Sequence, residues 1–210
     1  MYPTIDLSLT DEKRRLLDEY ASMLLSVNRK FNLISRSDIQ QVKTHHVGHC
    51  LAYGLNTFPK DCHIVDWGSG GGLPAIPIAI LWPEAHVTAV DSNAKKTRSI
   101  DLFCRRLGIS NCSTWQGRAH EWPGKLDYSV SRATAPLKDL WGWHERSSNE
   151  GTAGETEWSP GLICLKGGDM KAEIDHLHRD HPSCEVETIS LKEYFNDAYF
   201  ETKSIVHVHL

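Results

Sequence analysis

The chain of 210 residues lacks any apolar run long enough to cross a membrane. Its longest apolar stretch extends from Leu73 to Trp82, about half of the roughly 20 residues that a membrane-spanning helix needs. The segment that follows Met1 also lacks the apolar core of a secretory signal peptide. We therefore expect neither insertion into a membrane nor export.

Cysteine is sparse, and no two of the six cysteines form a C-x-x-C pair. A zinc ribbon or a redox site of the thioredoxin type would need such a pair. Most of the cysteines stand in apolar segments, so we expect reduced thiols in the core of a cytoplasmic protein.

Neither sign of charge is in large excess, since 23 Lys and Arg oppose 27 Asp and Glu for a net charge of -4. The total therefore indicates no nucleic-acid or membrane partner. Residues 95–106 nevertheless carry five basic residues against one acidic residue, whereas residues 169–201 carry three basic and nine acidic residues. If the protein binds RNA, we expect the basic residues near 29–36 and 95–106 to make the contact, with the acidic C-terminal third turned away.

The first quarter of the chain has helical patterning. Apolar residues recur at helical spacing from Thr10 to Phe31, with Thr10 as the expected N-cap, and a second helical stretch is expected from Ser37 to Tyr53. The pattern changes at Pro59. We therefore expect a helical N-terminal extension over residues 1–58 and a core domain over residues 59–210, packed as one unit.

Short apolar segments alternate with helical ones after residue 59. We expect strands at His63–Asp66, His86–Asp91, Cys112–Gln116, Leu126–Ser131 and Leu162–Lys166, and helices at 74–82, 93–107 and 136–145. This alternation predicts a parallel sheet with helices on both faces. Glu185–Ser190 and Ser204–His209 predict an antiparallel hairpin at the edge, and residues 146–160, rich in Gly, Ser, Thr and Glu, predict a mobile surface loop.

A glycine-rich segment follows the first expected strand, with the sequence Asp66-Trp67-Gly68-Ser69-Gly70-Gly71-Gly72. Glycines let the backbone approach a ligand, and a helix beginning near Pro74 would present free amides. The segment fits the pattern Asp-x-Gly-x-Gly-x-Gly of S-adenosylmethionine sites at every fixed position. The dinucleotide pattern fits only when the count starts at Gly70, so a nicotinamide cofactor is the weaker alternative and a turn without a ligand is the third.

Asp91 ends the second expected strand, about twenty residues beyond the glycines. A carboxylate there can accept hydrogen bonds from both ribose hydroxyls of an adenosine cofactor. The alternative interpretation is an N-cap of the following helix, and the two roles can coexist.

The twelve histidines raise the question of a metal. His45 and His49 lie four residues apart on one expected helix face, and His176, His178 and His181 cluster later. Neither group forms His-Glu-x-x-His, and no cysteine stands at zinc-finger spacing, so we expect no bound metal. Ser69 is not a nucleophile elbow of a hydrolase, because position 67 is tryptophan rather than glycine.

Six short segments are specific in combination because of their order and spacing. They are Asn28-Arg29-Lys30-Phe31-Asn32-Leu33, Asp66 to Pro74 with Ile76-Pro77, Asp91-Ser92 with Lys95-Lys96, Gly117-Arg118-Ala119, Ser131-Arg132-Ala133 and Leu165-Lys166-Gly167. With them the chain resembles the 16S ribosomal RNA guanine-N7 methyltransferase G family, also called glucose-inhibited division protein B. The resemblance covers nearly the whole chain except residues 146–160 and the extreme N-terminus.

The resemblance implies an α/β fold of the class I S-adenosylmethionine-dependent methyltransferases: Rossmann-like, with a mostly parallel seven-stranded sheet and a helical N-terminal extension. It implies methyl transfer from S-adenosylmethionine to guanine N7 in the decoding-region loop of 16S rRNA. Carried over by position, the cofactor-binding residues would be Asp66, Gly68, Ser69, Gly70, Gly72, Leu73, Asp91, Ala119, His120 and Arg132. Arg132 would also be the catalytic residue beside the reacting centre, and Lys95, Lys96 and Lys166 would hold RNA phosphates.

This chemistry needs no nucleophilic dyad. Guanine N7 has a free lone pair, so catalysis can come from alignment of donor and acceptor rather than from a general base. The alternative role for Arg132 is a structural ion pair, and for Lys95 and Lys96 a solvated helix face. The sequence shows no long apolar heptad pattern, and we expect a monomer.

Three positions depart from the family's pattern. The second helical segment holds His45 and His49 where the family has an arginine and an aspartate, and Lys203 stands where an arginine is expected. These departures support an alternative function, a catalytically weak or inactive S-adenosylmethionine-binding protein that associates with the ribosome. A histidine in place of a carboxylate also predicts activity that depends on pH near neutrality.

Overall fold

A computed structural model of the protein describes residues 9–29, 33–34, 36–132, 134–149, 154 and 157–210. Some expectations fall on other residues: Lys30, Phe31 and Asn32 in the N-terminal motif, Ala133, and residues 150–153, 155 and 156 of the expected loop lie outside the described part of the chain.

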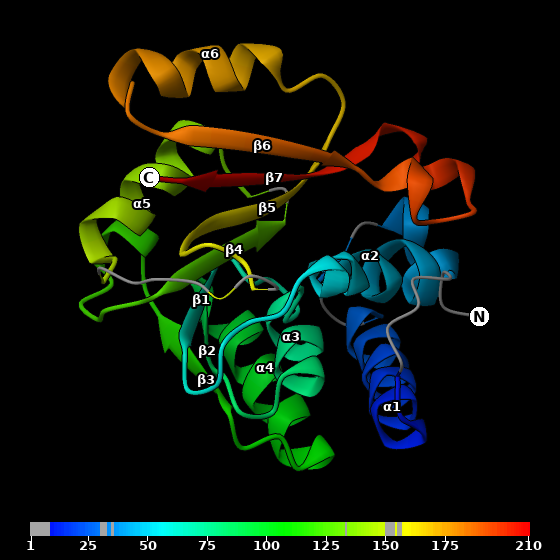
Figure 1. Ribbon diagram of the computed structural model, residues 1–210. Helices are drawn as coiled ribbons and strands as arrows, with labels where there is room; N and C mark the ends of the chain where they lie inside the picture. The colour runs from blue at the N-terminus through cyan, green and yellow to red at the C-terminus, as the bar shows by residue number, and fades with distance from the viewer. Residues whose placement is uncertain (1–8, 30–32, 35, 133, 150–153, 155–156) are drawn as a thin grey trace.

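Seven strands form one sheet in the order β3-β2-β1-β4-β5-β7-β6 (Figure 1). They are β1 His63–Trp67, β2 His86–Asp91, β3 Cys112–Gln116, β4 Tyr128–Arg132, β5 Gly161–Gly167, β6 Glu185–Ser190 and β7 Lys203–His209. Strands β1 to β5 are parallel, and β7 lies antiparallel between β5 and β6. The expected strands and edge hairpin are confirmed. The strand order reverses between β1 and β4, and ligands of such sheets bind at this point, beyond the carboxyl ends of the strands.

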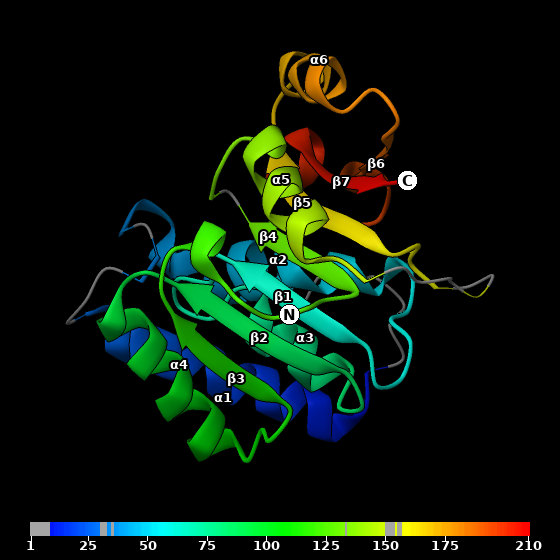
Figure 2. The same cartoon turned by 90° about the vertical axis from the view of Figure 1, so that its left-hand side faces the viewer.

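Helices cover both faces of the sheet (Figure 2). One face carries α3 (Ala75–Leu81) and α4 (Ala94–Leu107), against which α1 (Asp11–Asn28) packs. The other face carries α5 (Leu137–Ser147) and α6 (Lys171–Asp180). Every residue of α3 is buried, whereas α6 buries only Leu177 completely. Because its apolar pattern is weak, α6 is not among the helices expected from the sequence. No helix in the described residues is long and apolar enough to span a membrane.

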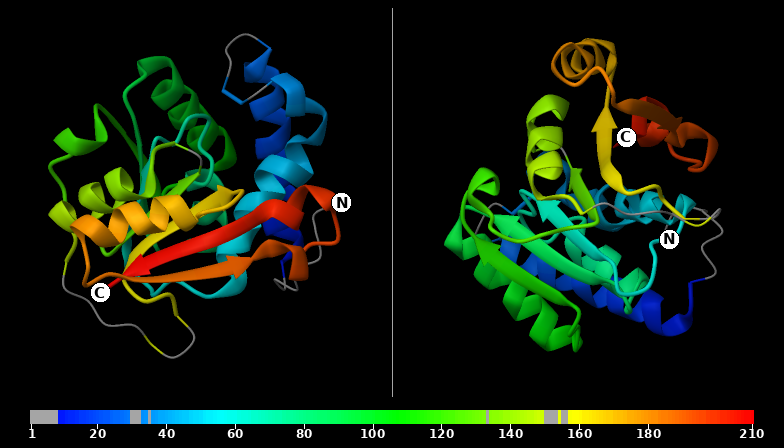
Figure 3. Two further views of the ribbon diagram at one scale, coloured as in Figure 1. Left: turned by 90° about the horizontal axis from the view of Figure 1, so that it is seen from above. Right: turned by 60° about the vertical axis from the view of Figure 1, so that its left-hand side comes forward.

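The N-terminal helical segment differs in detail from the expectation. The Thr10 hydroxyl accepts a hydrogen bond from the Lys13 amide at 3.2 Å, which confirms the N-cap. The expected second helix is instead a succession of short turns: η1 Arg36–Gln41, η2 Val42–Val47, α2 Gly48–Cys50 and η3 Leu51–Leu55. These turns lie beside residues 191–202 (Figure 3).

Tyr53 anchors this segment to the sheet. Its buried hydroxyl lies 3.1 Å from the Ser131 carbonyl of β4 and 3.2 Å from the Ile163 carbonyl of β5. Apolar side chains of residues 17–58 also belong to the same core cluster as the sheet and α3. Because the two parts share one core, the boundary at residue 58 stays a prediction.

The segment predicted to be a loop at 146–160 is anchored at both of its ends. Arg146 and Ser147 form the last turn of α5. Trp158 is 1% exposed, and its indole N–H donates to the Tyr53 carbonyl at 2.9 Å. The prediction of a mobile surface loop is therefore wrong for these described residues, because one large aromatic side chain ties the segment to the core.

His144 on α5 predicts that acid destabilises the fold. The ring is buried against Trp141 and hydrogen-bonded to the Ser129 hydroxyl, and burial lowers its pKa to about 3. The unfolded chain therefore takes up a proton near pH 6.5 that the folded state does not, so stability is present above that pH and is lost as the pH falls. For His144→Gln, we expect the loss of unfolding free energy between pH 7.5 and pH 5.0 to shrink by about 2 kcal/mol.

Urea unfolding at the two pH values measures this difference. The matched control is His178→Gln, because His178 is exposed on α6. The unfolding free energy of His178→Gln should depend on pH in the same way as that of the unmodified protein. An unchanged pH dependence in His144→Gln would contradict the prediction.

Candidate functional site

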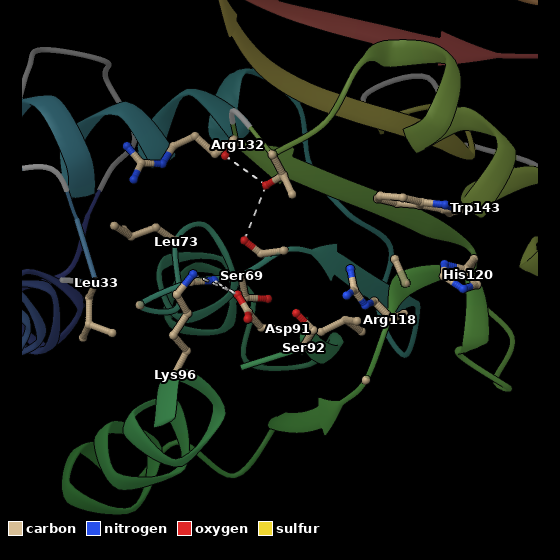
Figure 4. A pocket seen from close by; sticks show the side chains of 17 residues that line it. Leu33, Ser69, Leu73, Asp91, Ser92, Lys96, Arg118, His120, Arg132 and Trp143 are labelled. Atoms are coloured by element: carbon tan, nitrogen blue, oxygen red, sulfur yellow. Dashed lines mark hydrogen bonds and ion pairs between the residues drawn. The ribbon is translucent and has the colours of Figure 1, made fainter. Parts of the chain in front are cut away.

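A cavity of about 500 Å³ opens beyond the carboxyl ends of β1, β2 and β4 (Figure 4). This volume is in the range of small-molecule sites, roughly 300–1,000 Å³. The loop after β1, the end of β2, the segment after β3 and the end of β4 form its wall, and Trp143 of α5 closes one end. Eight of the ten residues expected to bind a cofactor line it: Gly68, Ser69, Gly70, Leu73, Asp91, Ala119, His120 and Arg132.

The loop after β1 requires glycine at position 68. Gly68 has φ +72°, and a Cβ added there would clash with Cγ2 of Thr134. The Gly68 and Ser69 amides donate to the Val90 carbonyl at 2.8 and 3.0 Å. The chain therefore turns sharply against the end of β2 and exposes backbone to the cavity.

Asp91 ties the loop to β2. One carboxylate oxygen, Oδ2, accepts from the Gly70 amide at 3.0 Å, and the other, Oδ1, accepts from the Asn93 amide at 2.9 Å. Lys96 Nζ lies 3.6 Å from Oδ2 (Figure 4). A carboxylate has about four lone-pair positions, so acceptor capacity remains for a ligand. The alternative interpretation as an N-cap is wrong, because Asn93 caps α4 through the Lys95 amide.

Asp66 and Gly72 lie behind the loop and do not line the cavity. Asp66 is fully buried, and its Oδ2 accepts from the Ala75 amide at 3.1 Å at the start of α3. Burial raises the pKa of Asp66 to about 7. Tyr20 of α1 supports the loop from the same side by donating to the Gly71 carbonyl at 2.9 Å. These groups can set the shape of the loop without touching a ligand in the cavity.

Arg132 reaches from the end of β4 toward the N-terminal helical segment (Figure 4). Its Nη1 donates to Nδ1 of His46 at 3.0 Å, and its Nε has no hydrogen-bond partner. In the described residues no carboxylate lies within ion-pair distance of Arg132, so the structure does not show the structural ion pair considered above. A cation at the cavity wall with donor capacity left can still bind an acceptor.

His49 lies beneath this wall, 3% exposed, with its ring edge-on to Tyr199 and Phe200. Burial, and next the charge of Arg132, hold its pKa well below 6.5. The imidazole is therefore neutral at every pH near neutrality. The burial of His49, which the sequence does not show, argues against the expected pH dependence of activity through this side chain.

Ala119 and His120 belong to a short turn, η4 (Ala119–Glu121), after β3. The Gly117 amide donates to the Asp91 backbone carbonyl at 3.2 Å, which holds this turn against β2. The sequence interpretation assigned no site role to several residues of the wall, among them Leu33, Ser92, Arg118, Thr134 and Trp143. Position directly after a strand could have indicated Arg118 and Thr134, whereas nothing in the sequence pattern of α5 distinguishes Trp143 from a core residue.

The three lysines expected to hold RNA have different surroundings. Lys95 is exposed on α4, and Lys96 is partly exposed beside the cavity. The ammonium of Lys166 is buried and donates to the Ala135 carbonyl and to Glu173, both at 2.8 Å. Lys166 therefore faces a protein carboxylate instead of solvent.

The sequence of this chain is similar to known proteins over most of its length. The sequence model described as rRNA small subunit methyltransferase G matches residues 13–198. A relative from Salinibacter ruber, named ribosomal RNA small subunit methyltransferase G, is 48% identical over 204 residues, 96% of this chain and 94% of the relative. A protein of the same name from Cytophaga hutchinsonii is 34% identical over 95% of this chain and 94% of its own length.

Solved structures show the same architecture at low sequence identity. Fibrillarin from Aeropyrum pernix, in complex with S-adenosyl-L-methionine, has a TM-score of 0.57 and 14% identity, over 78% of this chain and 74% of that one. A ribosomal protein L11 methylase from Lactobacillus delbrueckii subsp. bulgaricus has a TM-score of 0.58 and 16% identity, over 78% of this chain and 77% of that one. These likenesses show the class I methyltransferase fold.

Proposed function

Because this chain belongs to the rRNA small subunit methyltransferase G family, we propose that it transfers a methyl group from S-adenosylmethionine to N7 of a guanine in 16S rRNA. The observation that carries the proposal is the cavity, in which the glycine loop and Asp91 meet at the reversal of strand order. The substrate is 16S rRNA or the small ribosomal subunit, and the place of action is the cytoplasm.

The cavity fits the expected cofactor. Its wall combines a glycine turn that a Cβ at position 68 would block with a carboxylate directed at the loop. The glycine amides suit the amino-acid end of the cofactor, Asp91 suits a ribose with two vicinal hydroxyls, and Ala119 with Trp143 forms an apolar end for an adenine ring. His120, with its mostly exposed side chain, would lie at the rim of the same end.

The residues of the chain supply binding and orientation. S-adenosylmethionine supplies an activated methyl group on a sulfonium. Asp91 would fix the ribose, and the loop at Gly68 and Gly70 would fix the position of the methyl donor. Arg132 would hold the acceptor base or its phosphate at the other end of the cavity, so that N7 lies in line with the methyl group. Alignment of this kind needs no proton transfer, since N7 carries a free lone pair.

Methyl transfer to unmodified small-subunit rRNA, naked and in assembled subunits, tests the proposal. Mass mapping of the rRNA after incubation with labelled cofactor should place one methyl group on guanine N7. Binding of S-adenosylhomocysteine without transfer to either substrate would support the alternative, an inactive ribosome-associated protein, which the departures at His45, His49 and Lys203 favour. Calorimetric binding of NAD in place of S-adenosylhomocysteine would contradict both.

If α4 contacts RNA, substitution of its lysines should change how the affinity for rRNA depends on salt concentration. Lys95→Gln should lower the slope of log affinity for rRNA against log salt concentration by about 1, because one phosphate contact is lost. Lys166→Met should leave that slope unchanged and lower stability by about 2 kcal/mol, since a buried charged hydrogen bond disappears. Filter binding over a salt series, with urea unfolding of each variant, separates the two effects. Equal slopes of log affinity against log salt concentration for Lys95→Gln and the unmodified protein would show that Lys95 of α4 does not contact the RNA.

A further inference from the structure

A second cluster of ligand-type side chains lies far from the cavity, on the edge hairpin. Glu187 of β6 and His207 of β7 are directly paired across the antiparallel strands, and His209 follows His207 on the same face. One ligand atom from each of the three residues lies within 4.8 Å of the others. His209 pairs with Gly161 at the start of β5, so the cluster lies at the opposite end of the strands from the cavity.

The spacing of these groups leaves room between them. Oε2 of Glu187 lies 3.9 Å from Nδ1 of His207, and Oε1 of Glu187 lies 3.8 Å from Nε2 of His209. Both distances exceed the hydrogen-bond range of about 2.7–3.2 Å. A tetrahedral zinc site with bonds of about 2.0–2.1 Å brings its ligand atoms to roughly 3.3 Å from one another. A small movement of the exposed Glu187 side chain therefore suffices to enclose one ion.

His207 is oriented as a metal ligand. Its Nε2 lies 3.0 Å from the Ser159 carbonyl, which can only accept a hydrogen bond, so Nε2 carries the proton and Nδ1 directs its lone pair toward Glu187. Metal-binding histidines in general donate their second N–H in this way. Trp158 packs edge-on to the ring at 5.3 Å and fixes its plane.

We propose that Glu187, His207 and His209 form a binding site for a divalent transition-metal ion. Two imidazoles and one carboxylate are a donor set that zinc favours, and the exposure of Glu187 leaves a fourth position to solvent. The ion would tie the edge strand β6 to β7, and its role is structural because the cavity lies at the other end of the sheet. The expectation of no metal considered only ligands at short sequence spacing, whereas these three come together through strand pairing.

Calorimetric titration of the chelator-treated full-length protein with zinc chloride tests the site. We expect a single tight zinc ion per chain, and Glu187→Gln and His209→Ala should each weaken its affinity by at least about tenfold. The Glu187 side chain is exposed, and His209 is a partly buried residue at the end of β7, so these variants should fold. The controls are Glu201→Gln and His86→Ala, an exposed glutamate and an exposed histidine elsewhere, which should leave the affinity unchanged.

Two further measurements separate this site from other histidines. Cobalt in place of zinc should give the visible absorption of tetrahedral coordination in the unmodified protein and lose it in Glu187→Gln. Zinc should also raise the thermal midpoint of the unmodified protein, but not of His209→Ala, because only the folded hairpin assembles the ligands. The absence of saturable zinc binding, or binding that neither ligand variant weakens, would overturn the proposal.

Discussion

Asp91→Ala should lower the affinity for S-adenosylhomocysteine by at least about 100-fold. Two charge-assisted hydrogen bonds to a ribose are worth about 1.5–3 kcal/mol each, and tenfold in affinity corresponds to about 1.4 kcal/mol. The substitution also removes the acceptor of the Gly70 amide, one of the contacts that hold the glycine loop against β2. Calorimetric titration measures the affinity, and circular dichroism confirms that the variant is folded.

Two further variants serve as controls for the affinity of Asp91→Ala. Asp91→Asn keeps one acceptor oxygen and should lose less affinity than Asp91→Ala. Asp175→Ala removes an exposed carboxylate of α6 and should leave the affinity unchanged. If folded Asp91→Ala binds as tightly as the unmodified protein, Asp91 does not hold the cofactor and the assignment of the cavity fails.

Trp158→Ala should destabilise the fold by about 3–5 kcal/mol, the cost of removing a large aromatic side chain from a core. The indole is 1% exposed and bonded to the Tyr53 carbonyl at 2.9 Å, and the Trp158 carbonyl accepts from the Tyr128 hydroxyl at 2.8 Å. Loss of the indole side chain opens a cavity at the junction of the N-terminal segment, β4 and β7. Urea unfolding at pH 7.5 gives the free energy.

A milder substitution tests the same contact if Trp158→Ala does not fold. Trp158→Phe keeps most of the buried ring but leaves the Tyr53 carbonyl without its donor, so a loss of about 1–3 kcal/mol is expected. Tyr194→Ala, at an aromatic residue that is 40% exposed, should change stability little. A loss below about 1 kcal/mol for Trp158→Ala would show that the segment is not anchored there.

Strand positions and the glycine loop could be predicted from local sequence, because alternation and glycine act on the backbone within a few residues. The expected segments at His63–Asp66 and His86–Asp91 differ from β1 and β2 by at most one residue. Helical periodicity overestimates the amount of regular helix in the N-terminal segment. Residues 36–55 form short turns of different types, since tertiary contacts such as those of Tyr53 override helical periodicity there.

Side-chain environment is what the sequence could not predict. Lys166 and Lys95 both belong to the motifs that the chain shares with the family, yet one faces Glu173 and the other lies exposed. His49 and His120 likewise differ in burial, since the first is 3% exposed and the side chain of the second is mostly exposed. A motif does not show whether an individual polar side chain is buried. Burial, however, decides whether a charged or titratable group is desolvated and whether it can contact a ligand.

The sequence by itself determined the fold class, the glycine turn and Asp91 at the end of the second strand, because each depends on backbone conformation along a short segment. The tertiary structure alone decided which groups meet across the chain: Trp143 against Trp67, Arg132 against His46, Trp158 against Tyr53, and Glu187 against two histidines. Such encounters depend on strand order and register, which join residues far apart in sequence.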